Sequence, residues 1–500
     1  MRSVRSAPDW RWLVVVLLAG GALRLGALGE LALFGDEAYY YLWGQHLDWS
    51  YYDHPAGVAL LVRASTAVAG SSEFGIRWLN AITGLLSVAA TAWLSREMLR
   101  PRAHVYAAAL VALGAPFIIT SRIVYTDALH ILFALFSVGA YWRLLRHGGR
   151  RPRDGVVAGL SLAILVNTKY TAFLLAGALG LVTLLWHRQM LRRPALWLSV
   201  LIGALGLLPV VAWNTAHDYA SFRWQLEHLV SPSPGGALGS ALLGWLRNLR
   251  HALVYTTWPI ALVASLGLGN VASPGRRILT CTALAVTVPV VLSPANSPRN
   301  LSTGLVFLLV LAADLAARWA VTGDTRRAGR RVAVAAGVLA VGVYGAGTAA
   351  ALPSGLPWLP QSSGVALVRS DAAGWRAGAG AIRASGLDGD TVLVAVDYNV
   401  AGQLAYYTTV PVTTAWSQYR LWGIPPLGTA TVVAGDYVST ELITSRLRDA
   451  YESVTGPRAV VLSDGVGERR LWVWELAGLT IAPDELLDSI DFLRLSGIDA

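Results

Sequence analysis

Lysine and cysteine are almost absent from this chain of 500 residues. Lys169 is the single lysine among 40 basic residues, and Cys281 is the single cysteine, so no disulfide can form within the chain. Charged residues make up 14% of the sequence, whereas a soluble domain usually carries about 25%. The scarcity of charge therefore argues against a soluble protein. The formal net charge of +10 must therefore be explained within a membrane protein.

Long apolar runs take the place of the missing charge. Hydrophobic residues account for 55% of the chain, and the mean hydropathy is +0.51. Runs of roughly 18 to 22 apolar residues are long enough to cross a bilayer as helices. The sequence predicts a polytopic α-helical membrane protein with about eleven spans, at residues 12–33, 76–98, 103–121, 127–146, 154–168, 170–187, 195–213, 248–268, 278–293, 301–320 and 332–352. Arg24 and Glu30 interrupt the first run and should face protein or water rather than lipid.

The arginines cluster in short loops at every second turn between the predicted spans. Examples are the loops at residues 96–102, 143–153, 188–193, 276–277 and 326–331. This bias predicts that these loops lie in the cytoplasm. A nucleic-acid partner is not expected, because the arginines do not share one face. The N-terminus resembles a signal peptide, but without a cleavage pattern we expect an uncleaved first span with a cytoplasmic N-terminus.

The chain changes character near residue 353, where three prolines within eight residues indicate a linker. Beyond it, residues 391–397, 459–463 and 471–475 are typical of strands, and residues 375–385 and 399–407 of helices. We therefore predict a transmembrane catalytic domain at residues 1–352 and a small α/β domain at residues 353–500. With an odd number of spans, the second domain lies outside the cytoplasm.

Two acidic clusters lie in the first outer loop, which we place at residues 34–75. Asp36 and Glu37 appear where the first span ends, and Asp53 and His54 follow in the same loop. Adjacent carboxylates can act as a general base or hold a metal ion. A helix cap is the structural alternative for the first cluster, and a turn for the second. The many aromatic residues of this loop predict short helices at the interface, with an aromatic belt as the alternative.

Cationic side chains collect on the same predicted outer side. Arg122, Lys169 and Arg299 are the main candidates, with His217 beside them. A phosphate group is the simplest anion that would use them. Snorkelling to the interface is the structural alternative for Lys169, and a helix cap is the alternative for Asp127.

These motifs together resemble a known group of membrane enzymes. The segments DEAYYYLW at residues 36–43, DHP at 53–55 and EFGIR at 73–77 are similar to the N-terminal signature of bacterial glycosyltransferases of the protein-mannosyltransferase-like group. That group has the GT-C fold and includes the lipid A aminoarabinose transferases. Further similar segments are YTDA at 125–128, NTKYT at 167–171 and LPVVAWN at 208–214. The likeness is weaker beyond the linker.

The resemblance implies an inverting transfer of a sugar from a polyprenyl-phosphate carrier to an acceptor hydroxyl. Asp36 would be the general base, with Glu37 and Asp53 in support. The position of His54 usually carries a cation for the carrier phosphate, and the aminoarabinose transferases resemble Glu-Lys-Pro there. A histidine at this position would make phosphate binding depend on pH.

We therefore expect a multi-pass enzyme of the cytoplasmic membrane that acts on its outer face. Lys169, Arg122 and Arg299 join His54 as the predicted contacts to the carrier phosphate. No cofactor is certain, although Asp36 and Asp53 could hold a divalent cation. The acceptor is open among protein, glycan, lipid and cell-wall polymer. A transporter or flippase of a lipid-linked sugar is the alternative, but its polar groups would lie near the bilayer midplane, often in repeated halves.

Overall fold

The computed structural model describes residues 10–230, 273–292, 298–319, 391–408, 410–463 and 468–491, together with 372, 374–376 and 380. The chain divides into two compact units. Unit 1 comprises Met1–Leu28, His54–Leu61 and Arg77–Gly345, and unit 2 comprises Gly29–Asp53, Val62–Ile76 and Ala346–Ala500. The sequence predicts a single break at residue 352. In the structure, most of the predicted first outer loop instead clusters with the C-terminal residues.

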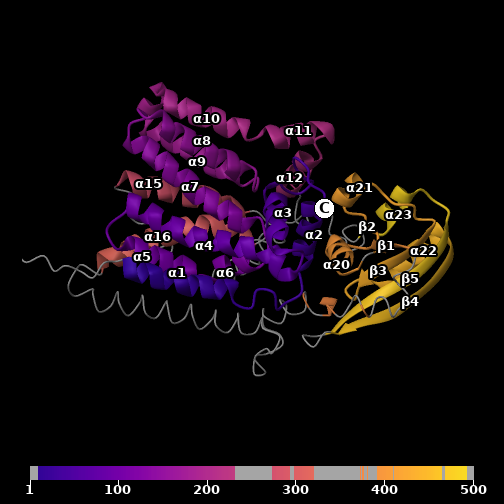
Figure 1. Ribbon diagram of the computed structural model, residues 1–500. Coiled ribbons are helices and arrows are strands. Elements are labelled where there is room, and N and C mark those ends of the chain that lie inside the picture. Colours follow the sequence, from indigo (N-terminus) through magenta and orange to yellow (C-terminus); the bar gives the residue numbers. More distant parts are fainter. Residues whose placement is uncertain are drawn as a thin grey trace, which may run out of the picture. The chain divides into compact units, whose positions relative to one another are not determined.

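Unit 1 is helical. Its described elements are α1 (Trp10–Leu25), α4 (Glu73–Met98, which begins in unit 2), α5 (Ala103–Leu113), α6 (Ala115–Arg122), α7 (Asp127–Arg146), α8 (Pro152–Val166), α9 (Ala172–Trp186), η1 (Arg188–Arg192), α10 (Pro194–Leu205), α11 (Leu208–Ala216), α12 (Ala220–Val230), α15 (Pro274–Leu292), η3 (Pro298–Leu301) and α16 (Ser302–Trp319). Helices α7, α8 and α10 pack in sequence against one another, as Figure 1 shows. The core of the unit is a continuous cluster of Ala, Leu, Val and Ile side chains on α4, α5, α7, α9, α15 and α16.

The predicted spans are confirmed in part. Among the described residues, five helices are long and apolar enough to cross a membrane, or six if the pair formed by α5 and α6, bent by 58°, is one span. The first helix ends at Leu25, earlier than expected. Two predicted spans, at residues 248–268 and 332–352, lie outside the described residues, so the total of eleven is not confirmed.

Arg24 shows how the unit accommodates charge within its apolar helices. Its side chain is fully buried, and its guanidinium donates to the carbonyl oxygens of Ala112 at 2.9 Å and Val111 at 3.1 Å. The prediction that Arg24 faces protein is confirmed. A second buried charge, Arg276, is neutralised by an ion pair with Asp314. Each buried cation thus has the partners that a low-dielectric surrounding requires.

Unit 2 combines the outer-loop helix α2 (Gly35–Gln45) and most of α3 (Gly57–Ala69) with a five-stranded sheet. The strand order is β2 (Val412–Thr414), β1 (Val392–Ala395), β3 (Thr429–Gly435), β5 (Glu468–Leu479) and β4 (Tyr451–Ser463). The remaining helices are α20 (Tyr398–Tyr407), α21 (Ser417–Leu421), α22 (Thr440–Ala450) and α23 (Pro483–Ser489). The short helices expected in the first outer loop are confirmed.

The sheet is mixed, and its parallel part sets the position of several polar residues. Strand β1 pairs in parallel with β2 on one side and β3 on the other, whereas β5 runs antiparallel to β3 and β4. After β1 the chain therefore adds β2 on one side of that strand, and it then crosses to add β3 on the other side. In open α/β sheets such a switch point is where ligands usually bind. The segments after β1 and β2 begin at this edge.

The predicted strands at 391–397, 459–463 and 471–475 and the predicted helix at 399–407 are confirmed by β1, β4, β5 and α20. Most of the predicted helix at 375–385 lies outside the described residues. The sequence pattern did not predict β2, β3 and α22. Strand β2 has only three residues, and its hydrogen bonds come from β1 rather than from a local pattern.

Helices α2 and α20 pack closely because each has a glycine at the contact. A Cβ atom at Gly35 would lie 2.3 Å from Oδ1 of Asn399, and one at Gly402 would lie 2.9 Å from the backbone nitrogen of Tyr39. Any larger residue would force the two helices apart. The glycine before Asp36 thus brings the start of α2 against the C-terminal domain.

Candidate active site

The acidic pair at the start of α2 separates into two different environments. The carboxylate of Glu37 is fully buried and accepts a hydrogen bond from the backbone N–H of Phe34 at 3.0 Å, so it caps the helix. Asp36 is only partly buried, and its carboxylate accepts a hydrogen bond from the hydroxyl of Tyr398 at 3.0 Å. The capping alternative therefore describes Glu37, while Asp36 faces a side chain of the C-terminal domain.

The charge of Asp36 acts on the second predicted carboxylate, Asp53. Burial raises the pKa of Asp53 to about 7, hydrogen bonds from Tyr39 and Trp416 oppose this rise, and the negative charge of Asp36 adds to it. The indole N–H of Trp416 also donates to the hydroxyl of Tyr39 at 3.1 Å. Burial raises the pKa of Tyr39 well above its ordinary value, so this phenol stays protonated and acts as a donor. Asp36 and Asp53, two of the predicted catalytic carboxylates, are thus near enough to influence each other electrostatically.

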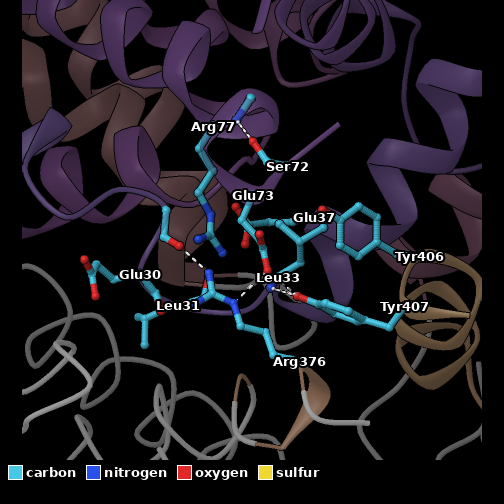
Figure 2. Close-up of polar contacts among 12 residues, drawn as sticks. Glu30, Leu31, Leu33, Glu37, Ser72, Glu73, Arg77, Arg376, Tyr406 and Tyr407 are labelled. Atoms are coloured by element: carbon cyan, nitrogen blue, oxygen red, sulfur yellow. Dashed lines mark hydrogen bonds and ion pairs between the residues drawn. The ribbon is translucent and has the colours of Figure 1, made fainter. Parts of the chain in front are cut away.

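The backbone before Asp36 is held by the C-terminal domain. Gln403 donates to the carbonyl oxygen of Leu33 at 2.6 Å, and the N–H of Leu33 donates to the hydroxyl of Tyr407 at 2.8 Å. Figure 2 shows Tyr407 together with Glu73 and Arg376; the ion pair between Arg376 and Glu73 measures 2.8 Å. The segment that leads into α2 is therefore fixed at both the N–H and the carbonyl of Leu33.

Lys169 is buried in unit 1 rather than extended toward an interface. Its ammonium group lies 2.9 Å from Oδ1 of Asp127 and 2.5 Å from Oδ1 of Asn300. The side chains of Lys169 and Asp127 are only 7% and 1% exposed. Arg299 lies over the ring of Tyr125 at 4.3 Å, and its charge also acts on Asp127. The structure thus groups two of the predicted phosphate ligands around one carboxylate.

His54 begins a segment that is attached to the turn carrying Lys169. The N–H of Gly57 donates to the carbonyl oxygen of Asn167 at 2.8 Å. A Cβ atom at Gly57 would lie 2.5 Å from that same oxygen, so the close approach needs a glycine. His54 itself is partly buried.

Arg122 has a different environment from the other predicted phosphate ligands. Its guanidinium donates to the carbonyl oxygens of Leu23 at 2.9 Å, Gly26 at 2.6 Å and Ala27 at 3.3 Å. Leu23 lies in the last turn of α1, whose final carbonyls have no partners within the helix, and Gly26 and Ala27 follow directly after its end. The geometry favours a helix-capping role for Arg122. His217 likewise bonds within its own turn, to the carbonyl oxygen of Trp213 at 2.8 Å.

The described residues contain no group of three or more His, Cys, Asp or Glu side chains placed to hold a metal ion. Asp36 and Asp53 offer two carboxylates. A magnesium ion is often bound by one or two carboxylates together with water and substrate phosphates. The divalent cation at this pair stays a prediction.

Sequence reasoning missed Tyr398, Trp416 and Gln403 as parts of this site. Tyr398 and Trp416 each come within a few residues of the carboxyl end of a parallel strand, β1 and β2. That position was the available signal, because such strand ends meet at one edge of a sheet. It could be used only once β2 was recognised.

Comparisons with known proteins define the class first. The fold matches the crystal structure of ArnT from Cupriavidus metallidurans in the apo state with a TM-score of 0.62 and 14% identity, covering 93% of this chain and 98% of that chain. The same protein bound to undecaprenyl phosphate gives a TM-score of 0.58 and 15% identity, with the same coverage of both chains. The chain therefore has the GT-C fold of membrane glycosyltransferases.

The sequence comparisons narrow this class. Residues 53–213 match the family model described as dolichyl-phosphate-mannose-protein mannosyltransferase. Lipid A galacturonosyltransferase RgtD of Rhizobium johnstonii is 28% identical over 195 residues, which are 38% of this chain and 40% of that protein. The resemblance to GT-C glycosyltransferases of the protein-mannosyltransferase-like group is thus confirmed. The match spans less than half of the length of this curated relative.

Proposed function

We propose that this protein is an inverting glycosyltransferase that moves a sugar from a polyprenyl-phosphate carrier to an acceptor hydroxyl. Support comes from the fold, from the family match over residues 53–213, and from relatives whose names describe sugar transfer or binding of undecaprenyl phosphate. The arginine pattern of the loops supports a reaction at the outer face of the cytoplasmic membrane. The C-terminal domain would then be extracytoplasmic and the N-terminus cytoplasmic.

We assign Asp36 as the general base because its environment differs from those of Glu37 and Asp53. Glu37 is fully buried and engaged in the cap of α2, and Asp53 is hydrogen-bonded to Tyr39 with a pKa of about 7. Asp36 is partly exposed and is oriented by Tyr398. A general base must reach the proton that it removes within hydrogen-bond distance, directly or through one water. Asp36 is best suited to reach an acceptor hydroxyl.

The carrier phosphate is assigned to cations of unit 1. In this proposal Arg299 supplies most of the positive charge, because Asp127 already offsets the charge of Lys169. Lys169 remains a hydrogen-bond donor to a phosphate oxygen. His54 is the third candidate, and its protonation would strengthen binding at lower pH. Neutralising the leaving phosphate stabilises the charge that develops in the transition state.

The proposal is tested with purified protein in lipid vesicles. A panel of polyprenyl-phosphate sugars is offered with glycolipid, glycan and peptide acceptors, and products are identified by mass spectrometry. Comparison of envelope lipids and glycans from cells with and without the gene selects the panel. We expect Asp36→Asn to abolish transfer while the protein remains folded. Asp48→Asn, which changes an exposed carboxylate of the same loop, is the matched control.

Full transfer by a folded Asp36→Asn protein would contradict the role of Asp36. Movement of the lipid-linked sugar across the vesicle membrane without an acceptor, and without any transfer product, would instead support the flippase alternative.

A further inference from the structure

We propose that Tyr398, in the C-terminal α/β domain, is a positioning residue for the carboxylate of Asp36. The inference rests on the proposed function, because it concerns how the base is held. It assigns part of the active site to a domain in which the sequence shows no catalytic motif. The contacts that helix α20 makes with the start of α2 place Tyr398 beside Asp36.

The hydroxyl of Tyr398 donates to Oδ1 of Asp36 at 3.0 Å. The tyrosine ring is fixed on its other faces by Trp416, with ring centroids 4.8 Å apart, and by Tyr39 at 5.2 Å. Trp416 in turn donates to the hydroxyl of Tyr39. The donor that contacts Asp36 is therefore held by aromatic packing, and it selects one orientation of the carboxylate.

The start of α20 is itself anchored. The side chain of Asp397 caps the N-terminus of α20, because it accepts hydrogen bonds from the backbone N–H groups of Asn399 and Val400. Tyr398 is the first residue of the helix that is capped in this way. Tyr437, just beyond β3, donates to the other oxygen of Asp397. The position of Tyr398 is thus determined by the edge of the sheet where β1 and β3 end.

The same helix also fixes the backbone that carries the base. Five and nine residues beyond Tyr398 on α20, Gln403 and Tyr407 hold the carbonyl and the N–H of Leu33. Directly before Gln403, Gly402 allows α20 to touch the backbone of α2. Helix α20 therefore holds the side chain of Asp36 through Tyr398 and the backbone of Leu33 through Gln403 and Tyr407. A small displacement of a catalytic group is costly, because the reacting atoms must be aligned.

A positioning hydrogen bond has consequences that a purely structural contact lacks. Removal of the hydroxyl lets the carboxylate of Asp36 rotate away from the reactive geometry. This change acts on the chemical step and leaves binding of the carrier lipid largely unchanged.

The experiment compares Tyr398→Phe with Tyr406→Phe in the vesicle transfer assay. Tyr406 lies on the same helix, but its hydroxyl donates to the carbonyl oxygen of Ser71 rather than to Asp36. For Tyr398→Phe we expect kcat to fall roughly 10- to 100-fold with little change in KM for the donor. Tyr406→Phe should keep the wild-type kcat and KM.

A second variant tests the same contact without removing it. Incorporation of 3-fluorotyrosine at position 398 keeps both the ring and the hydroxyl that contacts Asp36. The kcat of this protein should therefore stay close to that of the wild type, while that of Tyr398→Phe falls. This variant keeps the inference testable if Tyr398→Phe has a reduced melting temperature.

The outcomes separate the inference from the function on which it rests. If Asp36→Asn is inactive but Tyr398→Phe matches Tyr406→Phe in kcat and KM, the positioning role is overturned and the role of Asp36 stands. A 3-fluorotyrosine protein whose kcat falls as far as that of Tyr398→Phe also overturns it. If Asp36→Asn transfers sugar normally, the proposed base itself has failed.

Discussion

The raised pKa of Asp53 leads to a prediction about how the free energy of unfolding depends on pH. Burial beside Tyr39 and Trp416 raises its pKa from an ordinary value of 3.8 to about 7. Between these two values the folded protein keeps the proton of Asp53 while the unfolded chain has lost it. The free energy of unfolding therefore falls as the pH rises from about 4 to about 7, and the loss is complete above pH 7.

The magnitude follows from the size of the change in pKa. A rise from 3.8 to about 7 corresponds to at most about 4 kcal/mol of lost stability above pH 7. Asparagine at this position mimics the protonated acid and does not ionise. We therefore expect Asp53→Asn to be more stable than the wild type above pH 7 and nearly equal to it near pH 4.

The assay is thermal unfolding in detergent micelles, followed by tryptophan fluorescence at a series of pH values. The difference in melting temperature between Asp53→Asn and the wild type should grow from pH 4 to pH 7 and then level off. All other titrating groups are shared by the two proteins, so they cancel in this difference. The control variant Asp48→Asn removes an exposed carboxylate of the same loop. Its difference in melting temperature from the wild type should not grow in this way. A constant difference between Asp53→Asn and the wild type over the whole range would refute the reasoning.

Two further predictions concern the cations of unit 1. Lys169→Met leaves the buried carboxylate of Asp127 without its ion-pair partner and should lower the free energy of unfolding by about 3–5 kcal/mol, whereas the double variant with Asp127→Asn should recover most of it. Melting temperatures of the single and double variants check this, and an equally unstable double variant would count against it. Arg122→Gln should destabilise the protein by roughly 1 kcal/mol, through loss of its bonds to the end of α1, with an unchanged KM for the donor. Arg299→Gln should raise that KM, and equal KM values for the two variants would contradict the assignment.

The membrane part was largely readable from sequence because its signals are local. Apolar runs locate helices by length alone, and the helices α7, α15 and α16 appear where the runs predict them. The burial of Arg24 also followed from the sequence, since a charge inside an apolar run must find partners within the protein. The acidic motif at Asp36 and Asp53 was also found from a local signal, because it directly follows the first apolar run.

The roles of individual polar residues were less readable. Arg122 and Lys169 look alike in the sequence as cations near the ends of spans. In the structure one caps α1, while the other forms a buried ion pair with Asp127. The difference depends on which carbonyls and carboxylates come within about 3 Å after the helices pack. Periodicity and composition do not contain that information.

The sequence by itself determined that this chain is a membrane protein, where its main helices lie, and which loop carries the acidic residues, because hydrophobicity and charge act over short stretches of chain. Only the tertiary structure decided that Glu37 caps a helix, that burial raises the pKa of Asp53 to about 7, and that Tyr398 contacts Asp36. Asp36 and Tyr398 are separated by 362 residues along the chain. They meet because the outer loop folds onto the carboxyl edge of a sheet whose strand order no local pattern specifies.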